Sequence, residues 1–519
     1  MCGISAAYGK QLKNKEEFIK NSLALVKHRG YSLNETKILD NCVLGCNRLQ
    51  IVDRQNGIQP QTNEDGTVSV VLNGEIFNYK TLQRELLQKG HVFKTDSDTE
   101  VLVHLWEEYN EKMVEKLDSE MFAFFIYAEK NDVFFAARDP YGVKPLYYAT
   151  DASGNYYFAS EIKQLVPLRE INEVKLFPPG HYMLSGKLVQ YHSFPAPSKN
   201  ILSDEEAILT VRKLFDKAVR KRVETDLPIG VFFSGGIDSS AVLATAVKYN
   251  KNVTAFTVGK PDSPDLLVAQ RYCQENNISL RVLTPPSEEE LSKLIPEMVY
   301  AFESFEPNMM KSGVIAFYLG KLAKDNGFKV ILCGEGADEI FAGYPEFGNC
   351  KTSGEVDQTI FNFVTSLPRT QFQRVDRASM LSTLEVRVPF FDTAFADYCI
   401  PLASKFKLRN VGGKLVKKWV LREAMKDRLP DYIVNRDKVV FCEGAGYAGN
   451  QTVGGLFYDI VTNSISDSEF EQLKKDYPDW PLPDKEVAYY FKHYTRYLFT
   501  KAKFNQQRPT VNTISSIKI

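Results

Sequence analysis

Residues 229–240 read Ile-Gly-Val-Phe-Phe-Ser-Gly-Gly-Ile-Asp-Ser-Ser, and a helix-forming stretch at 241–249 follows directly. The apolar start predicts a buried strand, while Gly235 and Gly236 predict a tight turn that opens a helix. Backbone N–H groups at such a turn, the serine hydroxyls and the positive end of the helix can together hold phosphate oxygens. No lysine follows the glycines, whereas Asp238 offers a carboxylate to a metal ion between phosphates. The stretch therefore predicts a loop that holds pyrophosphate as a leaving group.

The order of these residues resembles the pyrophosphatase loop of enzymes that cleave ATP between its α- and β-phosphates and adenylate an acid or an amide. A Gly-Gly turn after a strand is by itself more often a tight turn without a ligand. Ser234 before the turn, with Ser239 and Ser240 after it, favours the phosphate interpretation.

Length and composition limit the class of protein. With 519 residues and 44% hydrophobic content, two or three domains with real cores are expected. A net charge of −1 gives no broad basic surface, so small molecules rather than nucleic acids are the expected partners. Eight cysteines without C-x-x-C spacing indicate reduced thiols in a cytoplasmic protein and argue against a zinc site or a disulfide framework. The start lacks a signal-peptide pattern, and the longest apolar run, 121–128, is too short to span a bilayer.

The first 195 residues contain many short strand patterns and few helical ones. The pattern predicts stacked sheets with helices outside. The expected strands are 4–8, 43–47, 68–72, 121–127, 133–137, 146–149, 156–159 and 181–184, and the expected helices are 14–25, 79–87 after the cap Asn78, and 99–109 after the cap Asp98.

A Pro-rich polar connector follows at 194–200, so we expect a first domain at 1–195, a linker at 196–204 and a second domain at 205–519. A capping box at 203–206 begins the second domain. Its strand patterns at 229–233, 253–258, 279–283 and 329–333 alternate with helical patterns, which predicts a parallel sheet covered by helices on both faces, and from about 358 the pattern is mostly helical. Ligands lie at the carboxyl ends of such strands, where Ser234, Val258 and Gly334 fall.

A second glycine-punctuated loop, Cys-Gly-Glu-Gly-Ala-Asp-Glu at 333–339, ends the fourth strand of this sheet. Asp338 could share a magnesium ion with Asp238, because Mg²⁺ typically takes one or two carboxylates together with phosphate oxygens. Glu335 remains as a candidate base. The alternative for this loop is a solvated acidic turn.

The amino terminus offers a second chemistry. If Met1 is removed, Cys2 gains a free α-amine with a pKa of about 7.7 to 8.0, which can accept the thiol proton. A cysteine at this position could equally be a small core residue or a chance occurrence. Polar groups on nearby strand ends favour the nucleophile: Arg48 suits an α-carboxylate, Asp98 an α-ammonium, and the Asn73 side chain with the Gly74 N–H can hold an oxyanion. With Glu75 they describe a pocket for glutamine.

Over roughly residues 1 to 500 the chain resembles the glutamine-dependent asparagine synthetase family. The matching segments are 1–4, 48–53, 73–78, 97–100, 138–146, 158–163, 234–240, 263–265, 334–339, 375–379, 384–390, 418–422 and 436–446.

The resemblance implies a fold, a reaction and a set of roles. The expected fold is an N-terminal α/β/β/α sandwich of the N-terminal-nucleophile hydrolase type, followed by an α/β pyrophosphatase-loop domain with a helical C-terminal part. The implied substrates are glutamine, aspartate and ATP, with Mg²⁺, and ammonia would pass between the two sites through an internal tunnel. In the first domain the resemblance implies that Cys2 is the nucleophile, that Asn73 and Gly74 bind the oxyanion, and that Arg48, Glu75 and Asp98 bind glutamine. In the second domain it implies that pyrophosphate and magnesium are bound by Ser234, Gly235, Gly236, Asp238, Ser239 and Asp338. It also implies that Lys418 stabilises charge on the α-phosphate and that adenosine is contacted by Phe232, Val258, Cys333 and Gly334.

The sequence departs from the family pattern at three places. The segment usually read His-Arg-Gly-Pro-Asp ends here in Tyr31 and Ser32, and Glu120 replaces a usual glycine. Lys311 stands where an arginine thought to meet aspartate is usual, which keeps the charge and loses the bidentate fork.

Several alternatives follow from these observations. The closest is a sister amidotransferase that amidates a different carboxylic acid. A tRNA-thiolating or lysidine-forming enzyme would be expected to show a basic face or sulfur-relay cysteines, and a β-lactam-forming relative needs no glutamine nucleophile. A catalytically dead homologue would have lost Cys2, Asp238 or Asp338. A homodimer is left open.

Overall fold

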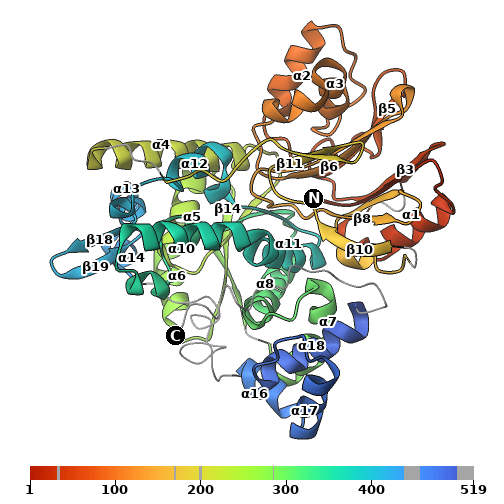
Figure 1. Cartoon of the computed structure of the whole chain (residues 1–519). Coiled ribbons are helices and arrows are strands. Elements are labelled where there is room, and N and C mark those ends of the chain that lie inside the picture. Colours follow the sequence, from red (N-terminus) through yellow and green to blue (C-terminus); the bar gives the residue numbers. More distant parts are fainter. Residues whose placement is uncertain (32–34, 169–170, 198–201, 285, 438–455, 499–519) are drawn as a thin grey trace. The chain divides into compact units, whose positions relative to one another are not determined.

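The computed structural model describes residues 1–31, 35–168, 171–197, 202–284, 286–437 and 456–498. Among these residues the chain forms two compact units (Figure 1). The N-terminal unit comprises Met1–Ser193 with Leu367–Asp376, and the C-terminal unit comprises Phe194–Ser366 with Arg377–Tyr497. No helix in the described ranges is both long enough and apolar enough to cross a membrane.

The N-terminal unit consists of two six-stranded sheets, with strand orders β10-β8-β9-β1-β3-β2 and β12-β11-β7-β6-β5-β4. The first sheet is built from β1 (Cys2–Tyr8), β2 (Glu35–Ile38), β3 (Cys42–Arg48), β8 (Tyr147–Asp151), β9 (Tyr156–Ala159) and β10 (Ile171–Leu176). The second is built from β4 (Gln61–Thr62), β5 (Val68–Gly74), β6 (Phe122–Ala128), β7 (Val133–Arg138), β11 (His181–Leu184) and β12 (Lys187–Gln190). The strand pairs within both sheets are antiparallel.

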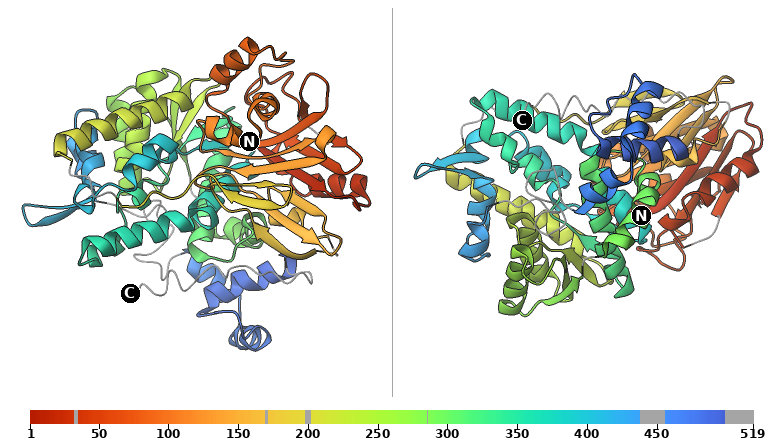
Figure 2. Two further views of the ribbon diagram at one scale, coloured as in Figure 1. Left: turned by 45° about the horizontal axis from the view of Figure 1, so that its top comes forward. Right: turned by 90° about the horizontal axis from the view of Figure 1, so that it is seen from below.

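Apolar side chains from the facing surfaces of the two sheets form one core, in which Ile4 and Leu44 of the first sheet pack with Val71 and Phe125 of the second. The outer face of the first sheet packs on α1 (Lys15–Ala24), and the outer face of the second packs on α2 (Tyr79–Gln88) and α3 (Val101–Tyr109). The strands and helices of this unit run from red to yellow in Figure 2. The predicted α/β/β/α sandwich is therefore confirmed.

Helix α2 begins at Tyr79 as predicted, but one predicted cap and one predicted helix start differ from the structure. Asn78 precedes α2, but its side chain makes no capping bond; Asn78 Nδ2 donates to the Lys116 carbonyl at 2.8 Å instead. The third helix begins at Val101 rather than at Thr99, because the Asp98 carboxylate accepts the N–H of Ile76 and does not cap the helix.

The C-terminal unit is built on a five-stranded parallel sheet with the order β15-β14-β13-β16-β17. The strands are β13 (Ile229–Phe232), β14 (Val253–Val258), β15 (Ser279–Leu283), β16 (Val330–Leu332) and β17 (Glu385–Arg387), and a separate hairpin is formed by β18 (Leu408–Val411) and β19 (Lys414–Lys417). The parallel sheet confirms the predicted fold class, and β17 adds a strand that the sequence pattern did not predict.

The order of the strands determines which helices cover which face. The chain runs from β13 to β14 to β15 in one direction through α5 (Ile237–Tyr249) and α6 (Pro264–Glu275). It returns across the sheet to β16 through α7 (Glu288–Phe302) and α8 (Pro307–Asp325). Because parallel crossovers are right-handed, the two pairs of helices lie on opposite faces of the sheet.

The C-terminal unit contains further helices. Ser203 begins α4 as predicted, since its side chain accepts the N–H of Glu206. The other helices are α4 (Asp204–Val223), α9 (Ala337–Ile340), α10 (Ser353–Ser366), α11 (Gln371–Leu381), α12 (Thr393–Cys399), α13 (Trp419–Met425), α14 (Asp431–Val434), α16 (Leu456–Asn463), α17 (Asp467–Asp476) and α18 (Lys485–Leu498), and the boundary between the two units falls within α11.

Candidate active sites

Cys2 is the first residue of β1 and lies in the core between the two sheets of the N-terminal unit. It stands opposite Arg48 in the antiparallel register of β1 and β3. The Cys2 backbone N–H donates to Asn73 Oδ1 at 3.0 Å, and Arg29 Nε donates to the Cys2 carbonyl at 2.9 Å. The structure thus brings Cys2, Arg48 and Asn73 together at the ends of three strands, as the sequence predicted.

The side-chain amide of Asn73 uses its oxygen in a hydrogen bond and leaves its nitrogen without one. Its Oδ1 accepts from Cys2, whereas its Nδ2 is buried and has no hydrogen-bond partner among the described residues. An unpaired buried N–H costs about 1–3 kcal/mol, so its presence beside a thiol points to a ligand oxygen that it would meet. Gly74 follows at a φ of 151°, where an added Cβ would lie 2.0 Å from the Met121 carbonyl oxygen, so only glycine fits here.

The groups expected to bind an amino acid surround the same strand ends. Arg48 Nη2 donates to the carbonyls of Val52 at 2.6 Å and Asp53 at 2.7 Å, which fixes the guanidinium on the loop that follows β3. The Asp98 carboxylate accepts the Ile76 N–H at 3.0 Å, and so lies next to buried Glu75 at the end of β5.

The Cys2 thiol is poised to ionise. A hydrogen bond with Cys46 lowers the pKa of Cys2 to about 6, against the raising effect of burial, and the positive amino terminus lowers it further. Burial raises the pKa of Cys46 well above its usual range, so that thiol stays protonated. Gln59, which the sequence did not indicate, donates from Nε2 to Cys2 Sγ at 3.9 Å and to Thr99 Oγ1 at 3.1 Å.

In the C-terminal unit, the pyrophosphate-loop candidate lies where the strand order of the sheet reverses. β13 pairs with β14 on one side and with β16 on the other, so the loops after β13 and β16 diverge at a switch point, the usual ligand site of such sheets. Phe232 and Val258 are the last residues of β13 and β14, and Cys333 and Gly334 directly follow β16.

The loop from 234 to 239 is braced by its own serines. The Ser234 N–H donates to Ser239 Oγ at 3.2 Å, and the Gly236 N–H lies 3.4 Å from Ser234 Oγ. Gly235 adopts a φ of 71°, a left-handed conformation that favours glycine. This geometry presents the loop at the amino terminus of α5, as an anion site requires.

Lys418 joins the two predicted metal-binding carboxylates. Its Nζ lies 2.7 and 2.6 Å from the two Asp238 oxygens and 2.6 Å from Asp338 Oδ1. Lys418 itself has a φ of 56°, an uncommon conformation for a residue with a side chain. At Gly343 an added Cβ would lie 2.0 Å from Asp338 Oδ1 and 2.1 Å from Lys418 Cε, so this glycine makes room for the group.

A cavity of about 330 Å³ opens beside this group, and Ser234, Gly236, Asp238 and Lys418 contribute to its wall. Arg436 donates to the Asp265 carboxylate at 2.5 Å and to the Ser234 carbonyl at 3.4 Å, which ties the loop to α6. Sequence reasoning missed the part of the wall formed by the β18–β19 hairpin and the segment after α14: Lys414, Leu415, Val416, Lys417, Asn435 and Asp437.

The acidic loop after β16 contains a further carboxyl group that the sequence did not single out. Burial raises the pKa of Glu339 to about 7, and the charges of Asp338 and Glu335 raise it further. The Tyr344 hydroxyl donates to Glu339 Oε1 at 2.6 Å. Glu335, the candidate base, is half-buried in the same loop.

Two family models match almost the whole chain: "Glutamine amidotransferase domain" over residues 1–190 and "Asparagine synthase" over residues 210–356 and 349–513. The chain belongs to the glutamine-hydrolysing asparagine synthetase family.

Three relatives show how far this likeness extends. Asparagine synthetase [glutamine-hydrolyzing] 3 of Arabidopsis thaliana is 33% identical over 94% of this chain and 86% of its own length. Asparagine synthetase [glutamine-hydrolyzing] 2 of Oryza sativa subsp. japonica is 34% identical over 94% and 84%. A probable asparagine synthetase [glutamine-hydrolyzing] of Dictyostelium discoideum is 31% identical over 95% and 93%.

At the position where an arginine is usual in this family, Lys311 lies on α8 and is 3% exposed. Its Nζ is 3.0 Å from both carboxylate oxygens of Glu486 on α18, and the Tyr490 hydroxyl donates to the same carboxylate at 3.3 Å. Lys311 is not among the described residues that line the 330 Å³ cavity. The structure therefore places this lysine in a buried ion pair.

The other departures from the family pattern have different settings. The Tyr31 N–H donates to the Arg48 carbonyl at 3.1 Å while its side chain is exposed, and Glu120 is fully buried. Ser32 and the family motif beyond residue 437 lie outside the described residues.

Proposed function

We propose that the protein makes asparagine, glutamate, AMP and pyrophosphate from aspartate, glutamine and ATP. Residues 1–195 would act as the glutaminase and 205–519 as the synthetase, with 196–204 as the linker. The observation that carries the proposal is the meeting of Asp238, Asp338 and Lys418 beside a phosphate loop, in a chain that also holds Cys2 against Asn73.

In the N-terminal unit the chemistry would follow from Cys2. Met1 is buried, so its removal would leave space beside the Cys2 nitrogen and convert that nitrogen into an amine. The amine takes the thiol proton, the sulfur attacks the glutamine amide carbon, and Asn73 Nδ2 with the Gly74 N–H binds the oxyanion. The amine returns that proton to the departing nitrogen, ammonia leaves, and water then hydrolyses the thioester to release glutamate. Arg48 and Asp98, with Glu75, would hold the α-carboxylate and the α-ammonium of glutamine.

In the C-terminal unit the aspartate side-chain carboxylate would attack the α-phosphate of ATP, and pyrophosphate would leave into the 234–239 loop. Carboxylate oxygens of Asp238 and Asp338 both contact the Lys418 ammonium group. Carboxylate oxygens placed in this way also suit Mg²⁺. Bound there, Mg²⁺ would supply positive charge to the pyrophosphate oxygens. Lys418 would then turn to the α-phosphate, and Glu335 would accept a proton as ammonia displaces AMP.

Lys311 lies in a buried ion pair and does not line the cavity, so the identity of the acid that accepts the nitrogen is the part of the proposal to test first. Pyrophosphate release should be measured with glutamine as nitrogen donor over a panel of carboxylic acids. Release with aspartate, and formation of asparagine, supports the proposal. Release with another acid and none with aspartate would make the protein a sister amidotransferase.

A cytoplasmic location is part of the proposal. The seven cysteines in the described part of the chain are all free, and six of them are buried. Free thiols of this kind suit a reducing compartment.

A further inference from the structure

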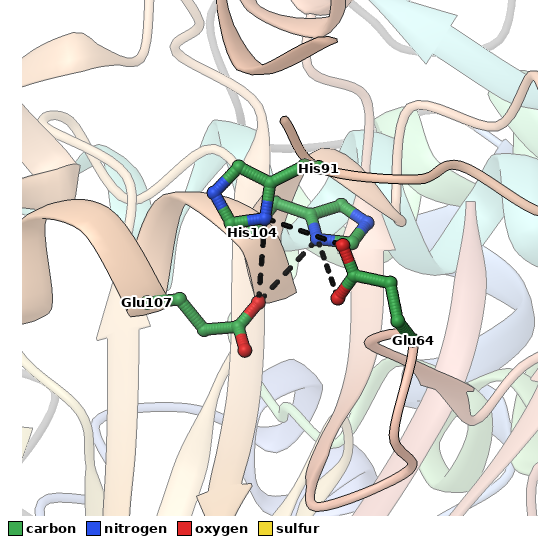
Figure 3. A group of neighbouring side chains, drawn as sticks. All are labelled: Glu64, His91, His104 and Glu107. Atoms are coloured by element: carbon green, nitrogen blue, oxygen red, sulfur yellow. Dashed lines mark ion pairs between the residues drawn. The ribbon is translucent and has the colours of Figure 1, made fainter. Parts of the chain in front are cut away.

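Four side chains with metal-binding atoms gather in the N-terminal unit, apart from the residues around Cys2. They are Glu64, in the turn between β4 and β5, His91, in the loop after α2, and His104 and Glu107 on α3. Their four ligand atoms all lie within 4.8 Å of one another. Figure 3 shows both carboxylates directed at the imidazole rings.

The separations between these atoms suit a tetrahedral metal ion. His91 Nδ1 is 3.4 Å from Glu64 Oε1 and 3.7 Å from Glu107 Oε2. His104 Nδ1 is 3.6 Å from Glu64 Oε2 and 3.4 Å from Glu107 Oε2 (Figure 3). Zinc bonds of about 2.0–2.1 Å in a tetrahedron place neighbouring ligand atoms about 3.3 Å apart. The four ligand atoms lie within 4.8 Å of one another, so the side chains could enclose one ion if they closed to the tetrahedral spacing.

His104 supplies an independent reason to expect a ligand. Its side chain is 0% exposed, and neither ring nitrogen makes a hydrogen bond with any residue that the structure describes. The ring packs against Phe93 and His91, with ring centroids 4.4 and 4.9 Å away. Buried polar groups are rarely left without a hydrogen bond, and at Nδ1, which has only the longer approaches of Glu64 and Glu107, a metal ion would supply a direct bond.

The outer nitrogens of both rings face carboxylates, as they do in many metal sites. His91 Nε2 is 3.2 Å from Glu108 Oε1, and His104 Nε2 is 3.7 Å from Glu100 Oε1. The hydrogen bond with Glu108 favours a proton on His91 Nε2 and leaves the His91 Nδ1 lone pair for the cluster, and Glu100 lies on the corresponding side of His104. Glu100 is itself fixed, because it accepts the N–H groups of Lys94 and Thr95 at 2.7 Å each.

We propose that Glu64, His91, His104 and Glu107 form a structural binding site for a zinc-class divalent ion. Imidazole ligands favour such an ion over magnesium, and two carboxylates balance its charge. Four protein ligands leave no open position, which is typical of a structural rather than a catalytic site. The ion would join the β4–β5 turn to α3 and brace the segment between α2 and α3, which also carries Asp98. The cysteine spacing that argued against zinc has no bearing on a site without cysteine.

The test uses the full-length protein, stripped with a chelator and then titrated with Zn²⁺ against a chromophoric competitor. Co²⁺ serves as the spectroscopic probe, since tetrahedral coordination gives strong visible absorption. We expect the protein to bind one equivalent of Zn²⁺ tightly, and we expect its thermal midpoint to rise as Zn²⁺ is added. Glu107→Gln and His91→Gln, at partly exposed positions, should each weaken binding at least tenfold. Cys2→Ala should keep the equivalent, which separates the site from the reactive thiol.

Glu115→Gln is the matched control, because it removes an exposed carboxylate of the same unit outside the cluster. It should bind Zn²⁺ as the unaltered protein does. The proposal is overturned if the unaltered protein takes up no equivalent of Zn²⁺, or if Glu107→Gln and His91→Gln bind as tightly as Glu115→Gln. It is also overturned if the equivalent disappears in Cys2→Ala.

Discussion

Replacing Lys311 by methionine tests whether the buried Lys311–Glu486 pair is structural, substrate-binding or both. The two residues are 3% and 4% exposed, and Nζ lies 3.0 Å from the carboxylate oxygens. Breaking a buried pair from one side leaves a buried charge and costs about 3–5 kcal/mol. For a domain of this size, 1 kcal/mol lowers the thermal midpoint by about 2–4 °C, so a fall of roughly 10 °C is expected.

The loss of stability in the Lys311→Met variant should depend on pH. Burial already raises the pKa of Glu486, and Lys311 is the main charge that lowers it. Without that lysine the folded-state pKa rises further above the unfolded value, so the folded protein binds the proton more readily. The Lys311→Met variant should therefore lose stability as pH rises through that pKa, and calorimetry should show a smaller deficit at pH 5.5 than at pH 7.5.

A second substitution separates stability from catalysis. Lys311→Met combined with Glu486→Gln removes both charges and should recover most of the thermal midpoint. If Lys311 also contacts aspartate, the double variant should still show a KM for aspartate raised roughly 10- to 150-fold, which corresponds to about 1.5–3 kcal/mol for one charged hydrogen bond. Lys311→Arg should retain aspartate activity. An unchanged midpoint in Lys311→Met would refute the buried-pair reasoning, and an unchanged KM in the double variant would exclude a contact with aspartate.

Three further predictions concern the two active sites. The rate at which iodoacetamide alkylates Cys2 should rise with pH around a midpoint near 6, while Cys46 stays unmodified by mass spectrometry; a midpoint near 9 would contradict the lowered pKa. Asp238→Asn and Asp338→Asn should each depress both glutamine- and ammonia-dependent synthesis by roughly 100-fold or more, and ADP with orthophosphate as the first products would disprove the AMP-forming route. Gly343→Ala should impair both syntheses but leave Cys2 alkylation intact, because its Cβ would displace Asp338; full activity would show that the tight packing is dispensable.

The strands that the sequence predicted and those that it missed differ in their position. In the N-terminal unit all eight predicted strands are found, and the four that were missed, β2, β4, β10 and β12, are the edges of the two sheets. In the edge strand β12, for example, three of the four residues are exposed. Such a strand lacks the apolar run or strong alternation that identifies a strand buried on both sides. The missed strand β17 is likewise an edge of the parallel sheet.

The candidate sites were predictable where one short motif carries the chemistry. The residues around Cys2 and the loop at 234–239 are examples, because spacing and residue type indicate the role. The pairing of Lys311 with Glu486 joins residues 175 positions apart, and no local pattern signals it. The Glu64 cluster is similar: the i, i+3 spacing of His104 and Glu107 was visible on one helix, but only the fold brings Glu64 and His91 to it.

The proposed division of labour between two separate sites is tested most directly by Cys2→Ala, assayed for asparagine and pyrophosphate with either glutamine or an ammonium salt. The substitution removes the thiol and leaves Asp238, Asp338 and Lys418 untouched. Synthesis from glutamine should be abolished, and synthesis from ammonium should continue at the rate of the unaltered protein. Retained glutamine-driven synthesis, or loss of the ammonium-driven reaction as well, would contradict the assignment of the two reactions to separate sites.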